Sequence, residues 1–72
     1  MENYKGKEYN TILAWVEDNI GYVQLNRPKA FNAINETLLN ESYEVMNLMS
    51  EDPEVRCIII HGHENVFAAG AD

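Results

Sequence analysis

Hydrophobic and polar residues alternate along two neighbouring stretches near the N-terminus. Every second position from Ile12 to Val16 is aliphatic, and this alternation predicts a strand over residues 10–17. Residues 20–26 are rich in isoleucine, valine and tyrosine and predict a second strand. Asp18-Asn19 lies between the two stretches and is typical of a tight turn. The pattern therefore predicts a β-hairpin.

The spacing of apolar residues changes to three and four positions after this hairpin and predicts an amphipathic helix over 35–50. Asn35 is the expected N-cap, Glu36 complements the helix dipole, and Asp52-Pro53 ends the helix. The apolar stripe consists of Leu38, Leu39, Ser42, Val45, Met46 and Met49. The residues expected to face away from the core are Glu41, Glu44 and Asn47.

A nearly continuous apolar run from Val55 to Ile60 predicts a third strand over about 55–61. Such a run is typical of a strand that is covered on both faces, and hence of one parallel to its neighbour. Cys57 lies inside the run, where we expect a small hydrophobe and not a catalytic thiol. The fold class is therefore α/β, with the order β-β-α-β and a right-handed crossover between the second and third strands.

Composition limits the classes of function. The 72 residues have a net charge of −7, with five basic residues against twelve acidic ones, which argues against nucleic acid as a partner. The N-terminus lacks an apolar signal core, and no apolar run approaches the roughly 18 residues of a membrane span. We expect no membrane association and a reducing, cytoplasmic location. His61 and His63 lack a convincing third ligand, so we expect no metal site.

Residues 66–72 hold four very small side chains shortly after the third predicted strand. Gly70 can adopt positive φ, so the neighbouring N–H groups can turn into a concavity that stabilises an anion. The alternative is an ordinary tight loop, closed onto the core by Phe67. The segment alone leaves both interpretations open.

Two motifs resemble the enoyl-CoA hydratase/isomerase (crotonase) family: Leu25-Asn26-Arg27-Pro28, and Phe67-Ala68-Ala69-Gly70-Ala71-Asp72 about forty residues later. The resemblance extends from about Trp15 to Asp72. It implies that residues 1–72 are the N-terminal β-β-α-β portion of a crotonase-like (ClpP/crotonase spiral) fold. The chain is then a piece of a larger enzyme, since the acid/base carboxylates of the family lie beyond Asp72.

The resemblance also implies roles for individual residues. The backbone N–H of Ala71 is expected to be one of two oxyanion-hole donors to the thioester carbonyl, with the second donor on a later glycine. Lys29, Ala30 and Phe31 resemble the segment that binds coenzyme A, and Ala69 and Asp72 flank the acyl end of the substrate. Arg27 either contributes positive charge for the coenzyme A phosphates or ends a strand. No separate cofactor is implied, because coenzyme A is part of the substrate.

The implied activity is that of an acyl-CoA enzyme of fatty acid metabolism, a lyase of the enoyl-CoA hydratase type. Isomerases, thioester hydrolases and dehalogenases share the oxyanion loop, so the reaction type stays open. The resemblance implies a homo-oligomeric parent, a trimer or hexamer, and no catalysis by residues 1–72 alone. A non-catalytic binding or assembly module of crotonase type is the alternative.

Overall fold

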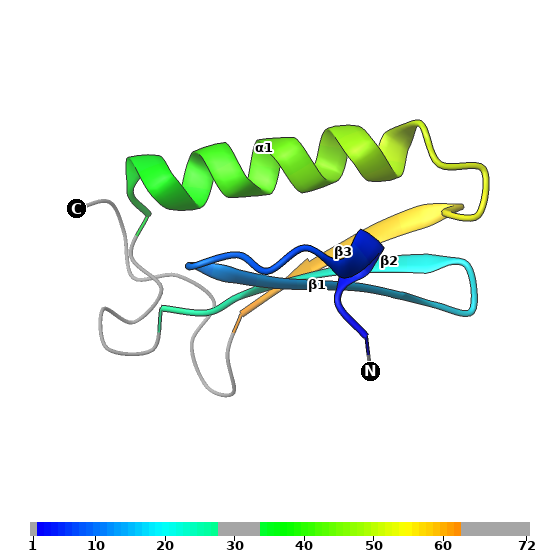
Figure 1. The fold of residues 1–72 in the computed structure, drawn as a ribbon, viewed down its shortest axis with the longest axis horizontal. Coiled ribbons are helices and arrows are strands. Elements are labelled where there is room, and N and C mark those ends of the chain that lie inside the picture. The colour runs from blue at the N-terminus through cyan, green and yellow to red at the C-terminus, as the bar shows by residue number, and fades with distance from the viewer. Residues whose placement is uncertain (1, 28–33, 63–72) are drawn as a thin grey trace.

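The computed structural model describes residues 2–27 and 34–62. Its elements are a short 3-10 helix η1 (Tyr4–Gly6), strands β1 (Ile12–Glu17) and β2 (Ile20–Leu25), helix α1 (Glu36–Ser50) and strand β3 (Cys57–His61). The helix lies across one face of the sheet (Figure 1). The predicted β-β-α-β order is confirmed.

The sheet has the strand order β1-β2-β3. β1 and β2 are antiparallel, with Trp15 opposite Tyr22, and β2 and β3 are parallel, with Gln24 opposite His61. The turn residues Asp18 and Asn19 both have positive φ, 53° and 64°. A two-residue hairpin loop with positive φ at both positions matches the right-handed twist of its strands. The predicted hairpin and the predicted parallel third strand are both confirmed.

The core lies between α1 and the sheet because the alternation of β1 and β2 and the apolar stripe of α1 face each other. Its buried side chains are Tyr4, Ile12, Ala14, Val23, Leu25, Leu38, Val45 and Met49. Leu39, which the spacing placed in the stripe, is 50% exposed. The helix buries a narrower face than the pattern predicts, centred on Val45 and Met49.

Gly21 on β2 allows α1 to approach the sheet closely. A Cβ atom at this position would lie 2.6 Å from Sδ of Met49, closer than two such atoms can stand. Met49 itself is 0% exposed, so its side chain has little room to move. The missing side chain of Gly21 is therefore part of how the helix packs.

β3 differs from its prediction of burial on both faces. Cys57, Ile59 and Ile60 are exposed, and the strand begins at Cys57, two residues later than the start of the apolar run. The physical reason is its place at the edge of the sheet, since α1 packs against β1 and β2. The expectation that Cys57 is a buried hydrophobe is wrong in this structure for the same reason.

The N-terminal segment, for which the sequence suggested no structure, packs against the fold. Tyr4 in η1 is 7% exposed and joins the core. Its hydroxyl donates to Oδ2 of Asp52, just after α1, over 2.7 Å. The segment thus covers the side of the core that lies between β1 and α1.

Candidate functional site

The carboxyl ends of β2 and β3 lie at the same edge of the sheet because the two strands are parallel. α1 begins at this edge too, since it follows β2 in the chain and runs back across the sheet (Figure 1). The described residues at the edge are Asn26 and Arg27 after β2, Ile34 and Asn35 before α1, and Gly62 after β3. In parallel α/β sheets this is the edge at which ligands bind.

The site residues predicted from the sequence lie outside the described residues. Lys29, Ala30 and Phe31 fall in residues 28–33, and Ala69, Ala71 and Asp72 fall in residues 63–72. The structure does describe the residues next to these two segments, namely Arg27, Ile34 and Gly62. All three lie at the same edge of the sheet. The assignments of these six residues stay predictions.

The start of α1 is fixed by its N-cap, as predicted. Asn35 has extended backbone angles, φ −132° and ψ 178°, and its Oδ1 accepts a hydrogen bond from the N–H of Leu38 over 2.9 Å. This bond satisfies one of the N–H groups that the first helical turn leaves without a partner. The cap therefore fixes where α1 begins at the edge of the sheet that carries the candidate site.

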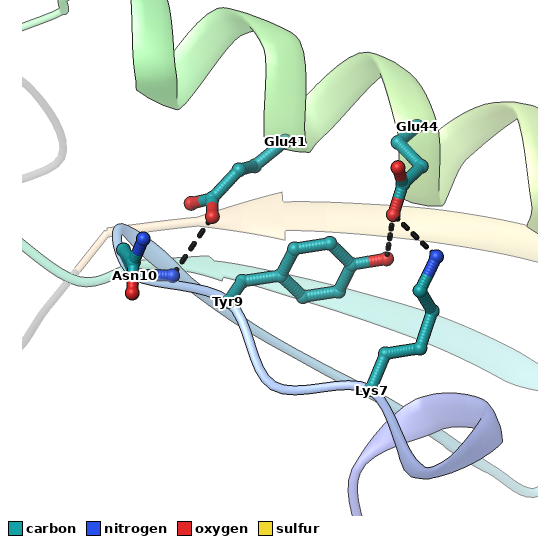
Figure 2. A network of polar contacts seen from close by, with 5 residues as sticks. All are labelled: Lys7, Tyr9, Asn10, Glu41 and Glu44. Atoms are coloured by element: carbon teal, nitrogen blue, oxygen red, sulfur yellow. Dashed lines mark hydrogen bonds and ion pairs between the residues drawn. The ribbon is translucent and has the colours of Figure 1, made fainter.

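Two glutamates of α1, which the sequence predicts to face away from the core, bind the N-terminal segment (Figure 2). The carboxylate of Glu41 accepts from the backbone N–H groups of Asn10 (2.8 Å) and Thr11 (2.7 Å), and from the Thr11 hydroxyl. Glu44 accepts from Nζ of Lys7 (2.7 Å) and from the Tyr9 hydroxyl (2.9 Å). Periodicity identifies these positions as polar, but it carries no signal for the segment that binds there.

These contacts shift pKa values in the direction that each hydrogen bond requires. The bonds from Lys7 and then Tyr9 hold the pKa of Glu44 below its ordinary value. The bond from Tyr4 lowers the pKa of Asp52. Burial, followed by the bond to its carboxylate partner, raises the pKa of Tyr4 to about 12, and the same two causes raise that of Tyr9 to about 12. The shifts favour the ionised carboxylate and the neutral phenol across the neutral pH range.

The face of the sheet opposite α1 carries an aromatic cluster of Trp15, Tyr22 and His61. The rings of Trp15 and Tyr22 are stacked with centroids 5.2 Å apart, and the His61 ring meets both edge-on. Nε2 of His61 is buried and has no hydrogen-bond partner among the described residues. Within residues 2–27 and 34–62, no three His, Cys, Asp or Glu side chains are grouped to hold a metal ion.

Comparison with known proteins decides the family. The model of the enoyl-CoA hydratase/isomerase family matches residues 16–72, which include both predicted binding segments. The chain belongs to this family. The resemblance seen in the two sequence motifs is thereby confirmed.

Relatives support the assignment over most of the chain. The chain is 42% identical over 64 residues to a protein of Mycobacterium bovis named "Probable enoyl-CoA hydratase echA8", covering 89% of the chain and 25% of the relative. It is 44% identical over 55 residues to the mitochondrial enoyl-CoA hydratase of Pongo abelii, covering 76% of the chain and 19% of that enzyme. The chain thus spans about a quarter or less of the length of these relatives.

The fold agrees with solved structures of the same family. An enoyl-CoA hydratase/isomerase from Xanthobacter autotrophicus Py2 superposes with a TM-score of 0.87 at 31% identity, over 90% of this chain and 24% of that chain. The β-β-α-β unit therefore matches part of a crotonase fold, as predicted. In the part of the chain that the structure describes, no helix has the length and apolar character that a membrane crossing needs.

Proposed function

We propose that this chain is the N-terminal part of an acyl-CoA enzyme of the enoyl-CoA hydratase type, which adds water across the α,β-double bond of an enoyl thioester. The observation that carries the proposal is the family match over 16–72, because it includes both segments that the sequence singles out. The described flanks of these segments lie at one sheet edge, which supports a shared site.

Ala71 is the residue to which we assign the direct role in catalysis. Attack of water on the β-carbon moves electrons toward the thioester carbonyl, whose oxygen gains negative charge. A fixed backbone N–H at Ala71 stabilises this charge more than it stabilises the neutral substrate, so it lowers the barrier to reaction. Ala69 and Asp72 flank the acyl group in this proposal. The second N–H donor comes from a residue beyond Asp72.

Lys29, Ala30 and Phe31 are the proposed contacts to coenzyme A. The ammonium group of Lys29 suits a phosphate, and the short side chain of Ala30 lets a ligand approach the backbone. The chain has a net charge of −7, so a cation in this segment matters for binding an anionic ligand. Coenzyme A enters as part of the substrate, and the proposal requires no separate cofactor.

Proton transfer is assigned to carboxylates beyond Asp72, so residues 1–72 alone should be inactive. An oxyanion donor without an acid or a base cannot activate water at a useful rate. We further propose that the whole protein is a homo-oligomer, a trimer or hexamer, and that it works in the cytoplasm. Gel filtration and cell fractionation test these two statements.

The experiment begins with the reading frame of the encoding gene beyond Asp72. The protein that it encodes should hydrate crotonyl-CoA, measured as loss of the ultraviolet absorbance of the conjugated thioester, whereas purified residues 1–72 should not. An in-frame stop directly after Asp72, or hydration by residues 1–72 free of host enzyme, would contradict the proposal.

The role of Ala71 is tested in the longer protein with Ala71→Pro, which deletes the N–H. Loss of one oxyanion donor typically lowers kcat by about 10²–10³. Ala71→Gly keeps the N–H and serves as the control, with activity expected within about tenfold of the parent. If the folded proline variant binds coenzyme A and keeps near-normal kcat, the oxyanion role of this loop has to be abandoned.

A further inference from the structure

Thr11 is hydrogen-bonded to both arms of the chain that flank residues 28–33. Its carbonyl oxygen accepts from the N–H of Asn26, just after β2, over 2.8 Å. Its own N–H and hydroxyl donate to Oε1 of Glu41 on α1. Thr11, the residue just before β1, therefore links the end of β2 to α1 through hydrogen bonds, and these bonds close residues 26–41 into a ring.

Glu41 is the member of this ring that connects it to the helix. Oε1 accepts from Thr11 while Oε2 accepts from the N–H of Asn10 over 2.8 Å, so both carboxylate oxygens bind successive residues of the N-terminal segment. Thr11 is 8% exposed, so loss of the carboxylate would leave its N–H without its protein partner at a largely buried residue. A glutamine at position 41 has only one side-chain oxygen, so it could accept at only one of these two places. At the other place its NH₂ group would face the backbone N–H of Asn10 or Thr11, which is also a donor.

We propose that Glu41 is a positioning residue that fixes the distance between the end of β2 and the start of α1, the two described ends between which the proposed coenzyme A contacts lie in the sequence. The expected effect on coenzyme A binding rests on the proposed function. The hydrogen bonds that support the positioning role itself all lie between described residues. Glu44 is its natural comparison. Glu44 also binds the N-terminal segment from α1, yet its partners Lys7 and Tyr9 make no described bond to Asn26.

The test compares Glu41→Gln with Glu44→Gln in the 72-residue chain by amide hydrogen exchange read by NMR. In Glu41→Gln the amides of Thr11 and Asn26 should exchange about tenfold faster, as expected when one charge-assisted bond is lost. The amide of Val23, in the middle of β2, should change by less than about threefold. Glu44→Gln should leave Asn26 unchanged.

A second pair of variants keeps the proposal testable if Glu41→Gln does not fold. Thr11→Val removes the hydroxyl donor and should speed exchange at Asn26, whereas Thr11→Ser keeps the hydroxyl and should restore slow exchange. If Asn26 exchanges at the parent rate in Glu41→Gln, or if the whole ladder of β2 accelerates equally, Glu41 has no special effect on this edge and the proposal is wrong.

Titration with coenzyme A on the same samples separates this proposal from the proposed function. Coenzyme A should shift the resonances of Arg27 and Ile34 in the parent chain and in Glu44→Gln, and several-fold less in Glu41→Gln at equal concentration. If no sample responds to coenzyme A while the exchange pattern appears as expected, the positioning role is upheld and the assignment of the binding segment is contradicted.

Discussion

Replacing Gly21 by alanine tests how closely α1 packs on β2. The new Cβ would lie 2.6 Å from Sδ of Met49, 3.2 Å from Cγ1 of Val55 and 3.3 Å from Cε of Met49. Met49 is 0% exposed, so the methionine can yield only by displacing other core side chains. Overpacking of this kind costs about 1–3 kcal/mol. Native domains of this length are typically stable by on the order of 4–11 kcal/mol, so a loss of this size should be measurable.

The assay is thermal unfolding followed by circular dichroism, in which each kcal/mol lowers the Tm of a domain of this size by about 4–8 °C. The cause is isolated by combining Gly21→Ala with Met49→Ala. If the clash with Met49 carries the cost, Gly21→Ala should cost less by about 1 kcal/mol in the Met49→Ala background, a coupling that residues in contact typically show.

Gly6→Ala is the matched control for this cycle. Gly6 has φ +70°, and a Cβ atom added to it would have nothing within 4 Å, so alanine there costs backbone strain and touches nothing. Its effect should add to that of Met49→Ala. An unchanged Tm in Gly21→Ala, or additivity with Met49→Ala, would refute the argument that this glycine is required by packing.

The remaining predictions concern pH, the hairpin turn and association. Asp52, whose pKa is lowered, should stabilise the fold fully above its ordinary pKa of 3.8 and lose that contribution as the pH falls through its folded pKa. Tyr4 should contribute fully below its ordinary pKa of 10.0 and lose its contribution as the pH rises through its folded pKa of about 12. The urea concentration at the unfolding midpoint should therefore form a plateau against pH that falls on both sides, and a flat profile would count against these two bonds. Asn19→Asp should cost about 1 kcal/mol in urea unfolding, because the Nδ2 that donates to the Glu54 carbonyl over 2.9 Å is replaced by an acceptor, whereas Asp18→Asn should be nearly neutral. The chain should self-associate at high protein concentration, because β3 exposes apolar side chains at a sheet edge. Association should increase with salt concentration, because salt screens the repulsion between chains of charge −7. A monomer by light scattering at both low and high salt would contradict this.

Local patterns were sufficient for the elements themselves. Alternation at Ile12 and Ala14, turn chemistry at Asp18-Asn19 and the cap at Asn35 each depend on residues only a few positions apart, and each prediction is confirmed. The parallel pairing of β3 followed from its apolar run and from the helix before it. Its burial did not follow, because burial depends on what packs against a strand, and α1 lies over β1 and β2.

The sequence predicted residues of the candidate site only in segments that contain a recognisable motif. The segments around Lys29 and Ala71 have motifs, whereas Glu41 has none, since its importance arises from Thr11, thirty positions earlier in the chain. A charged residue on the outer face of a helix looks the same in sequence whether it meets water or a backbone N–H. Tyr4 was missed for a similar reason: its partners in the core are distant in sequence.

The attachment of the N-terminal segment has a consequence for the order in which the chain folds. Its hydrogen bonds to α1 and to Asp52 join residues that are 30 to 48 positions apart in the chain. Closing loops of that length costs entropy and is rewarded only once the hairpin and α1 are both in place. The segment should therefore dock last and detach first. Variants at Tyr4 should therefore accelerate unfolding while leaving the folding rate nearly unchanged, because contacts that form after the transition state change mainly the unfolding rate.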